Sequence, residues 1–174
     1  MMTKNFKEIG SCIFVIGKTL GHLYQSEFFR EILNFHEGPH PEVNLFNEKN
    51  NGETILKLIE ENLIKSAHDV SLGGIITALS KMSILGNKGF KLNKLKILMN
   101  KFEYFFGEDQ GRYILEISKD NLKKVETILK ENSVHFDQLG VVTSKEIIID
   151  NEPIINIDEL IKSNTSWLKK YMVQ

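Results

Sequence analysis

Residues 66–75 read SAHDVSLGGI, and this stretch indicates how the chain folds. Together with the residues before it, it predicts a short strand over Leu63–His68. Two glycines, Gly73 and Gly74, then open a helix, and Gly86 stands where a C-terminal glycine cap is expected. The buried face of that helix would carry Ile75, Leu79 and Met82, which recur at helical spacing. A strand that leads directly into a helix predicts a sheet with helices packed on it.

Strands and helices alternate along the rest of the chain as well. Further strands are expected over Ser11–Ile16, Arg112–Ser118, Val134–Val142 and Glu146–Asp150. Further helices are expected over Ser26–Leu33, Asn44–Asn62, Asp120–Glu131 and Asp158–Lys170. Pro39 and Pro41 keep the segment between the first two of these helices extended or turning. This interleaving predicts an α+β domain in which a mixed β-sheet is flanked by helices.

Specific structural roles are also expected for single residues within these elements. Ser26 and Asn44 are expected to cap the first two helices, because their short side chains accept hydrogen bonds from helix N–H groups. Gly52 is expected to break or bend the second of them, since glycine is a poor helix former. Thr143–Ser144 would form a tight turn between the last two strands. Trp167 is expected on the inner face of the final helix.

Composition limits the class of protein. At 174 residues the chain has room for one ordinary domain. Lys and Arg number 22 against 23 Asp and Glu, which argues against a nucleic-acid partner and against a polybasic membrane anchor. No apolar run reaches the roughly 18 residues that a membrane-spanning helix needs. The one cysteine, Cys12, excludes a disulfide within the chain and lies in an apolar run, so a core thiol in the reducing cytoplasm is expected.

Polar residues cluster where the strand of the opening stretch meets its helix. Backbone N–H groups at a helix start favour anions, and glycines let a ligand approach that backbone closely. Asp69 is the hard oxygen ligand that a nucleotide-bound Mg²⁺ prefers, and Ser71 can hydrogen-bond a phosphate. The simpler alternative is that Asp69 and Ser71 only cap the helix, with His68 hydrogen-bonded in the core.

A second polar segment, FGEDQGR at 106–112, precedes an expected strand. Glu108, Asp109 and Gln110 concentrate carboxylate and amide groups in one loop, and they suit a metal or a cationic ligand. Arg112 can clamp a phosphate through two parallel hydrogen bonds. The alternative is a solvated turn in which the acidic residues pair with the arginine and contribute little to stability.

The remaining candidates indicate no site by themselves. The loop over Gly21–Glu27 is explained by a helix start with a glutamate in its first turn. His22, His36 and His40 do not have the spacing of a zinc site. The chain also lacks a G-x-G-x-x-G loop, a Walker-type loop and a G-x-S-x-G elbow.

Four segments together carry a resemblance to a known family. They are GHLYQSEF at 21–28, GPHPEVNL at 38–45, SAHDVSLGG at 66–74 and FGEDQGRY at 106–113. In this order they resemble the C-terminal domain of phosphoribosylformylglycinamidine synthase, also called formylglycinamide ribonucleotide amidotransferase. That family belongs to the superfamily of aminoimidazole ribonucleotide synthetase. The resemblance extends from about Phe6 to Val142; each motif alone is weak, and the ordered set of four is specific.

The resemblance implies an ATP-dependent step of purine synthesis. Such enzymes convert formylglycinamide ribonucleotide to its amidine with ammonia from glutamine, after ATP has phosphorylated the amide oxygen. Catalysis of this kind depends on positioning and on charge stabilisation by Mg²⁺. The family's chain has two similar halves, and residues 1–174 correspond to the last domain of the second half. The catalytic centre belongs to the first half, so no catalytic residue is assigned here.

The resemblance and the local chemistry together define an expected auxiliary nucleotide site that takes ATP or ADP. Asp69 would be its Mg²⁺ ligand. The nucleotide- or phosphate-binding residues would be Ser71, Gly73, Gly74, Glu108, Asp109, Gln110 and Arg112. Three positions depart from the family pattern, because Leu72 stands where Asp is usual, Tyr24 where Gly is usual and Asn44 where Asp is common.

The implied partners are the other domains of the same synthetase. In the short form of the enzyme they include a separate glutaminase subunit and a small bridging subunit. This domain alone is then expected not to turn over substrate. Two alternatives remain open: a sister enzyme (aminoimidazole ribonucleotide synthetase, selenophosphate synthetase or thiamine-monophosphate kinase), or a stand-alone nucleotide-binding module without catalysis.

Overall fold

The sheet predicted from the sequence is present in the computed structural model, which describes residues 1–93 and 99–172. Its strands are β1 (Cys12–Ile16), β2 (Ser66–Asp69), β3 (Phe90–Leu92), β4 (Tyr113–Ile117), β5 (Phe136–Val142), β6 (Glu146–Ile149) and β7 (Glu152–Asn156). They form one sheet in the order β2-β4-β1-β5-β3-β6-β7. All neighbouring strands run antiparallel except β3 and β6, which are parallel. The expectation of a mixed sheet in an α+β fold is therefore confirmed.

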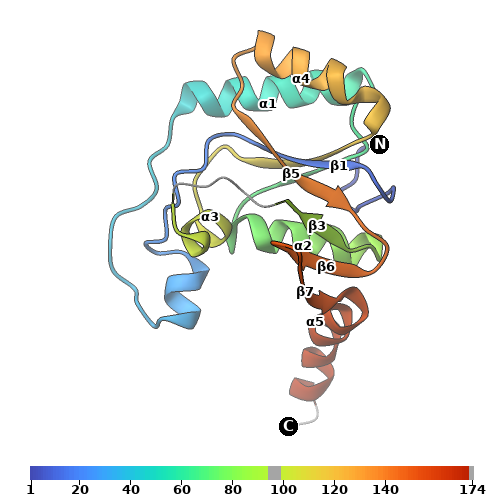
Figure 1. Cartoon of the computed structure of the whole chain (residues 1–174). Helices are drawn as coiled ribbons and strands as arrows, with labels where there is room; N and C mark the ends of the chain where they lie inside the picture. Colours follow the sequence, from blue (N-terminus) through green and yellow to red (C-terminus); the bar gives the residue numbers. More distant parts are fainter. Residues whose placement is uncertain (94–98, 173–174) are drawn as a thin grey trace.

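Helices cover both faces of this sheet. They are η1 (a short π-helix, Phe28–Ile32), α1 (Leu45–Glu60), α2 (Gly74–Gly86), α3 (Lys101–Phe106), η2 (a 3₁₀ turn, Lys119–Asn121), α4 (Leu122–Glu131) and α5 (Ile157–Met172). Figure 1 shows α1 and α4 on one face, α2 on the other, and α5 extending away from the body. In the part of the chain that the structure describes, no helix is long and apolar enough to cross a membrane.

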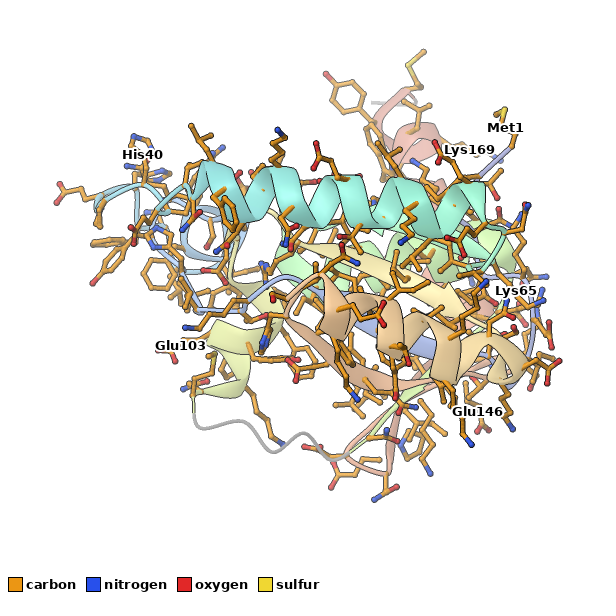
Figure 2. The ribbon with its side chains drawn as sticks, turned by 90° about the horizontal axis from the view of Figure 1, so that it is seen from above. Met1, His40, Lys65, Glu103, Glu146 and Lys169 are labelled. Carbon is orange, nitrogen blue, oxygen red and sulfur yellow. The ribbon has the colours of Figure 1, made fainter. Side chains whose placement is uncertain are left out.

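The apolar core lies in two layers, one on each face of the sheet. Phe14 belongs to the layer under α1 and α4, where it joins Leu58 and Leu129. Ile13, the next residue along β1, points the other way and joins the layer under α2. Strand β1 is apolar on both faces for this reason, as a strand in the middle of a covered sheet must be. Figure 2 looks down onto α1 and α4 above the first of these layers.

The cap predicted at Asn44 is formed, and Ser26 makes the expected side-chain hydrogen bond one residue before Glu27, the N-cap of η1. The side chain of Asn44 accepts a hydrogen bond from the N–H of Asn47 at 3.0 Å, and α1 begins at the next residue. Ser26 Oγ accepts from the N–H of Phe29 at 3.2 Å, and η1 follows. The prediction that Gly52 breaks α1 is wrong, because the helix is continuous through it. Buried packing along α1 outweighs the roughly 1 kcal/mol preference against glycine.

Tertiary structure confirms one other expectation and corrects two. Thr143–Ser144 connects β5 to β6 as expected, although β3 lies between these two strands in the sheet. Trp167 is 61% exposed and does not face the core, since α5 leaves the sheet after its first turns. The C-terminal cap of α2 is Asn87, which adopts a left-handed conformation (φ 51°), rather than Gly86. Elements β3, α3 and β7 were not predicted.

Gly86 has a different role, which leads to a testable expectation. A Cβ atom there would overlap the carbonyl oxygen of Phe6 and lie 2.8 Å from its nitrogen. We expect Gly86→Ala to destabilise the domain by about 1–3 kcal/mol through this overlap, although alanine is the better helix former. Gly52→Ala is the matched control, because its Cβ would meet nothing closer than the Tyr113 hydroxyl at 4.0 Å. Urea unfolding should show a loss for the first variant and none for the second.

Candidate functional site

Three segments distant in sequence meet at one edge of the sheet. Tyr113, the first residue of β4, lies opposite Asp69 of β2 on one side and Ile16 of β1 on the other. Because β4 runs antiparallel to both neighbours, its start lies beside their ends. The corner after β2 (69–74), the loop before β4 (106–112) and the loop after β1 are thereby placed together.

Glu108 joins the corner and the loop directly. Its Oε1 accepts hydrogen bonds from the N–H of Gly73 and from the N–H of Glu27, each at 2.8 Å. Its own N–H donates to the carbonyl oxygen of His22 at 2.9 Å. The sequence-based expectation that the glycine corner and the acidic loop converge is confirmed by these contacts.

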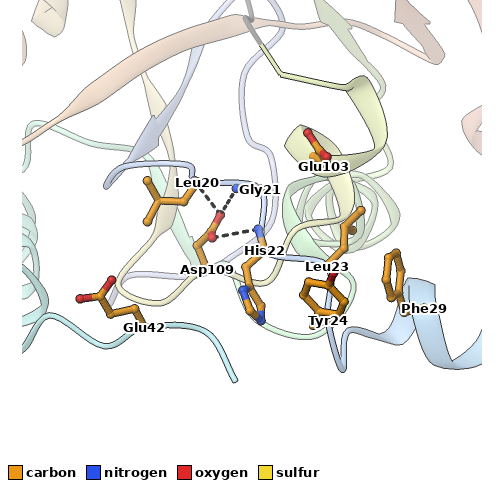
Figure 3. A pocket seen from close by; sticks show the side chains of 9 residues that line it. All are labelled: Leu20, Gly21, His22, Leu23, Tyr24, Phe29, Glu42, Glu103 and Asp109. Atoms are coloured by element: carbon orange, nitrogen blue, oxygen red, sulfur yellow. Dashed lines mark hydrogen bonds between the residues drawn. The ribbon is translucent and has the colours of Figure 1, made fainter. Parts of the chain in front are cut away.

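Asp109 fixes the loop that follows β1. Its carboxylate accepts hydrogen bonds from three consecutive N–H groups, those of Leu20 (3.0 Å), Gly21 (3.0 Å) and His22 (3.1 Å). Figure 3 shows these bonds. The residue is only 4% exposed. Because every one of these contacts is internal, Asp109 acts as an anchor for the loop.

Arg112 is buried beside this anchor, with 1% of its surface exposed. Its guanidinium donates to the carbonyl oxygens of Asp109 (3.1 Å) and Gly107 (2.6 Å) and to the hydroxyl of Thr19 (3.2 Å). Burial lowers the pKa of Arg112, and the nearby Asp109 carboxylate, 3.5 Å away, opposes that effect. The expectation that Arg112 clamps a phosphate is corrected. Its N–H groups point inward and are hydrogen-bonded to Asp109, Gly107 and Thr19, so they stabilise the loop.

Asp69 and Ser71 are the exposed polar members of the corner. The side chain of Asp69 is 65% exposed and lies 3.2 Å from Nδ1 of His68. His68 itself is buried, and its Nδ1 contacts the carbonyl oxygen of Asp69 at 2.7 Å. Burial raises the pKa of Tyr113, and the negative charges of Glu48 and Asp69 raise it further. Two negative charges therefore lie near the Tyr113 hydroxyl at this edge of the sheet.

A magnesium ion would find a single protein ligand at the corner. Within residues 1–93 and 99–172, no three His, Cys, Asp or Glu side chains are arranged to hold a metal ion. Asp69 offers one accessible carboxylate. Mg²⁺ in nucleotide sites is often held by one or two carboxylates and by the phosphates, so Asp69 fits such an ion only when a nucleotide supplies further oxygens.

Two cavities open beside the loops rather than at the glycines. One has a volume of about 380 Å³ and is shown in Figure 3; the other, of about 220 Å³, is more polar. The first is lined by Leu20, Gly21, His22, Leu23, Tyr24, Phe29, Glu42, Glu103 and Asp109. The second is lined by Lys18, Leu20, Glu42, Asn44, Asn47, Glu48, Asn51, Asp109, Gln110 and Gly111.

The second cavity contains polar groups that sequence reasoning missed. Gln110, an expected site residue, is exposed at its edge. Lys18, Glu48 and Asn51 share the cavity with it, and Asn51 donates to the carbonyl oxygen of Gly111 at 2.9 Å. The polar face of α1 was the available signal, because amides and a carboxylate recur there at helical spacing.

Tyr24, one of the three departures from the family pattern, has a structural explanation. Its ring packs against Gly38, where any Cβ atom would overlap it, and it meets Phe29 edge to face at 5.7 Å. The tyrosine therefore fills space between the loop after β1 and the segment around Gly38. Leu72, another of these departures, is 58% exposed beside the glycines.

Sequence comparison shows which known proteins this chain is similar to. The model of the family "AIR synthase related protein, C-terminal domain" matches residues 8–150. Phosphoribosylformylglycinamidine synthase subunit PurL of Pelagibacter ubique is 64% identical over 172 residues, which are 99% of this chain and 24% of that protein. The corresponding subunit of Nitrobacter hamburgensis is 36% identical over 96% of this chain and 22% of its own length.

Solved structures share the fold at low sequence identity. Thermotoga maritima PurL complexed with ATP matches with a TM-score of 0.71 at 19% identity, over 92% of this chain and 27% of that one. Thiamine-monophosphate kinase from Stenotrophomonas maltophilia matches with a TM-score of 0.58 at 13% identity, over 88% and 54%.

The chain spans about a quarter of the length of the curated relatives it matches. The family model nevertheless covers most of the chain, including all three segments that meet at the site. The four ordered motifs and the mixed sheet agree with that match. This chain belongs to the family of AIR synthase related proteins, as their C-terminal domain.

Proposed function

We propose that this chain acts as the C-terminal domain of a phosphoribosylformylglycinamidine synthase in purine biosynthesis. The observation that carries the proposal is the 64% identity to a PurL subunit over 99% of the chain. The complete enzyme would convert formylglycinamide ribonucleotide to the amidine with ATP and ammonia. The solved relatives from Thermotoga maritima include PurL complexed with ATP and PurL complexed with FGAR, which supports these substrates.

Within that enzyme, residues 1–174 would form a single non-catalytic domain. Its seven described strands share one sheet, and both core layers pack on it. The proposed auxiliary nucleotide site uses the exposed side chains of Asp69, Ser71 and Gln110. Glu108, Asp109 and the buried Arg112 hold the surrounding loops in place through the contacts described above. Magnesium, when it is bound with a nucleotide, would neutralise phosphate charge beside Asp69.

The proposed partners are suggested by the length of the relatives, because this chain matches only about a quarter of each. We infer that the other domains of the synthetase pack on this one, and that glutamine-derived ammonia comes from a glutaminase subunit with a small bridging subunit. A structure of PurLQS from Thermotoga maritima matches this chain, which supports an assembly of that kind. A cytoplasmic location agrees with the buried thiol of Cys12 and the balanced charge.

A chimera tests the proposed function. We expect Pelagibacter ubique PurL to keep its ammonia-dependent activity when its matching quarter is replaced by residues 1–174. The reason is that at 64% identity the packing surfaces of this domain should be largely retained. This chain alone should release no phosphate from ATP above the blank, because the catalytic centre lies elsewhere. Phosphate release with substrate, ATP, Mg²⁺ and ammonia is the measurement.

The control is a chimera that carries the matching quarter of the Nitrobacter hamburgensis protein. At 36% identity to this chain it differs at most of the matched positions, so it shows how much identity the graft requires. A folded but inactive chimera with this chain would contradict the proposal. Turnover by residues 1–174 alone would contradict the assignment of a non-catalytic domain.

A further inference from the structure

Helix α5 is fixed to the domain at its start and uncovered beyond it. Ile157, its first residue, is completely buried, and its N–H donates to the carbonyl oxygen of Lys145 at 2.8 Å. The ammonium group of Lys145 donates in turn to Asp158 at 2.7 Å. From this start the helix extends away from the body (Figure 1). The first turn therefore sets the direction of α5, and the later turns stand in solvent.

One face of α5 is apolar along its whole length. At about 100° per residue, the apolar side chains fall on a single stripe made of Ile157, Leu160, Ile161, Trp167, Leu168, Tyr171 and Met172. Leu160 packs against the core layer under α2, whereas the last four members are between 52% and 74% exposed. A continuous exposed row of this kind is typical of an interaction surface.

An apolar cavity continues the stripe onto the body of the domain. It has a volume of about 320 Å³, and of its ten lining residues only Ser80 is polar. Leu160 lines this cavity and belongs to the stripe, so the two surfaces are continuous. The edge strand β7 lines it too, but Pro153 lacks the N–H group that an added strand would need. The surface therefore suits the apolar face of a helix.

The polar side of the same helix indicates the charge of the occupant. Residues 162–172 contain Lys162, Lys169 and Lys170 and no acidic residue. Among the residues that the structure places, none of these three lysines forms an ion pair, although six other lysines do. An occupant with carboxylates beside its apolar face would complement this charge.

The relatives indicate where such an occupant lies. The family model ends at residue 150, before β7 and α5 begin. The PurL subunit of Pelagibacter ubique matches 172 of the 174 residues, so α5 is included in that match. Only 24% of that subunit corresponds to this chain. Helix α5 is thus shared with PurL without being part of the family model, which favours a partner within the synthetase.

We propose that the apolar stripe of α5 and the adjoining cavity bind an amphipathic helix from the part of the synthetase outside residues 1–174. That helix carries Asp or Glu beside its apolar face, and these carboxylates pair with Lys169 and Lys170. The proposal rests on the proposed function, because it takes the occupant from the same enzyme.

Amide hydrogen exchange tests whether the stripe is covered. The Pelagibacter ubique PurL chimera that carries residues 1–174 is compared with residues 1–174 alone. In the chain alone the amides of residues 165–172 should exchange quickly, because the apolar face of these turns is exposed. In the chimera they should exchange at least tenfold more slowly. Pelagibacter ubique PurL itself gives the same measurement on its matching segment if the chimera does not fold.

Cross-linking with a carbodiimide tests the charge of the occupant, since this reagent joins a lysine amine to a carboxylate in contact with it. In the chimera, Lys169 or Lys170 should be joined to an Asp or Glu outside residues 1–174. Lys124 is the control, because it lies 3.0 Å from Glu61 and should be joined to it in both proteins. Links of Lys169 and Lys170 only within residues 1–174 would overturn the acidic occupant.

Two substitutions on α5 test the stripe itself. Leu168→Glu places a charge on the stripe and should make residues 165–172 of the chimera exchange at least tenfold faster. Ser166→Glu is the matched control, because it adds the same charge about 200° around the helix and should exchange as the wild type does. Neither change should affect urea unfolding of residues 1–174 alone, since Leu168 is already 52% exposed there. Equal protection of α5 in the two chimeric variants would contradict docking through the stripe.

Other occupants give different results. Dimerisation of residues 1–174 alone, with slow exchange of α5, would replace the proposed partner by a second copy of this chain. A blue shift in the emission of Trp167, the only tryptophan, on addition of vesicles with anionic phospholipid would indicate a membrane surface instead. Fast exchange of α5 in a folded chimera would overturn the proposal even if that chimera is active. Slow exchange in an inactive chimera would contradict the proposed function and leave the docking surface in place.

Discussion

Replacing Arg112 by methionine is expected to destabilise the domain by about 3–5 kcal/mol, the loss typical of breaking a buried ion pair from one side. The guanidinium is 1% exposed and donates to three internal acceptors, two of them carbonyl oxygens of its own loop. Methionine fills much of the volume but leaves those acceptors unpaired. It also leaves the buried Asp109 carboxylate without its cation, 3.5 Å away in the present structure.

Two further variants show whether the geometry or the charge of Arg112 matters. Arg112→Lys keeps the charge but cannot reach three separated acceptors with one ammonium group, so an intermediate loss is expected. Arg30→Met removes a surface arginine that pairs with Glu27 at 3.7 Å, and it should change the free energy of unfolding by less than about 0.5 kcal/mol. Urea unfolding followed by circular dichroism is the measurement. A loss below 1 kcal/mol for Arg112→Met would show that the guanidinium does not stabilise the loop.

Local sequence patterns were sufficient to predict those strands and helix caps that depend only on neighbouring residues. The apolar run before Gly17 became β1, which lies in the middle of the sheet and is buried on both faces. Asn44 became the cap of α1 because capping depends on a side chain and an N–H group three residues away. In each case the deciding interaction is contained within a few residues of sequence.

Elements that depend on distant partners were missed. Strand β3 has three residues and is stabilised by pairing with β5 and β6, which follow it by some fifty residues. Strand β7 contains Pro153, which usually argues against a strand, and it is tolerated because β7 is an edge strand. Trp167 was placed inside because its helix is amphipathic, yet α5 extends beyond the sheet that would have covered it.

The sequence predicted which segments meet at the candidate site, but it predicted the contacts of their side chains only in part. The sequence indicated that the glycine corner and the acidic loop would meet, and the bond between Glu108 and Gly73 confirms it. The sequence did not reveal that Glu108 and Asp109 would bind backbone N–H groups. Those donors lie more than thirty residues away, and a carboxylate that accepts from backbone looks the same in sequence as one that faces a ligand.

Glu116 is the second residue whose replacement should have a large effect, although it lies far from the candidate site. It is fully buried in β4. Its carboxylate accepts hydrogen bonds from the N–H of Lys7 (2.9 Å), the N–H of Glu8 (2.8 Å) and the hydroxyl of Ser66 (2.8 Å). We expect Glu116→Ala to destabilise the domain by about 2–4 kcal/mol, because it leaves these donors unpaired and opens a cavity.

The effect of Glu116→Ala should be concentrated in the N-terminal segment. That segment contributes Phe6, which is completely buried, to the core layer under α2, and its Thr3 carbonyl oxygen accepts from the N–H of Ala67 at the edge of the sheet. Without Glu116 the segment loses the two backbone hydrogen bonds that Lys7 and Glu8 donate to the carboxylate. Limited proteolysis should then cleave within residues 1–10 of the variant before the rest of the domain is attacked.

Two controls distinguish the loss of anchoring from a general loss of packing. Glu116→Gln keeps the shape and one acceptor, but its NH₂ group faces N–H donors, so about half of the destabilisation of Glu116→Ala is expected. Glu126→Ala removes a glutamate from α4 that pairs with Lys130 at 4.0 Å, and it should leave unfolding and proteolysis unchanged. If Glu116→Ala lowers the free energy of unfolding without early cleavage near the N-terminus, the carboxylate stabilises the core by packing alone and does not hold the segment. Early cleavage in Glu116→Ala, with full protection in Glu126→Ala, shows that one buried carboxylate attaches the first ten residues to the sheet.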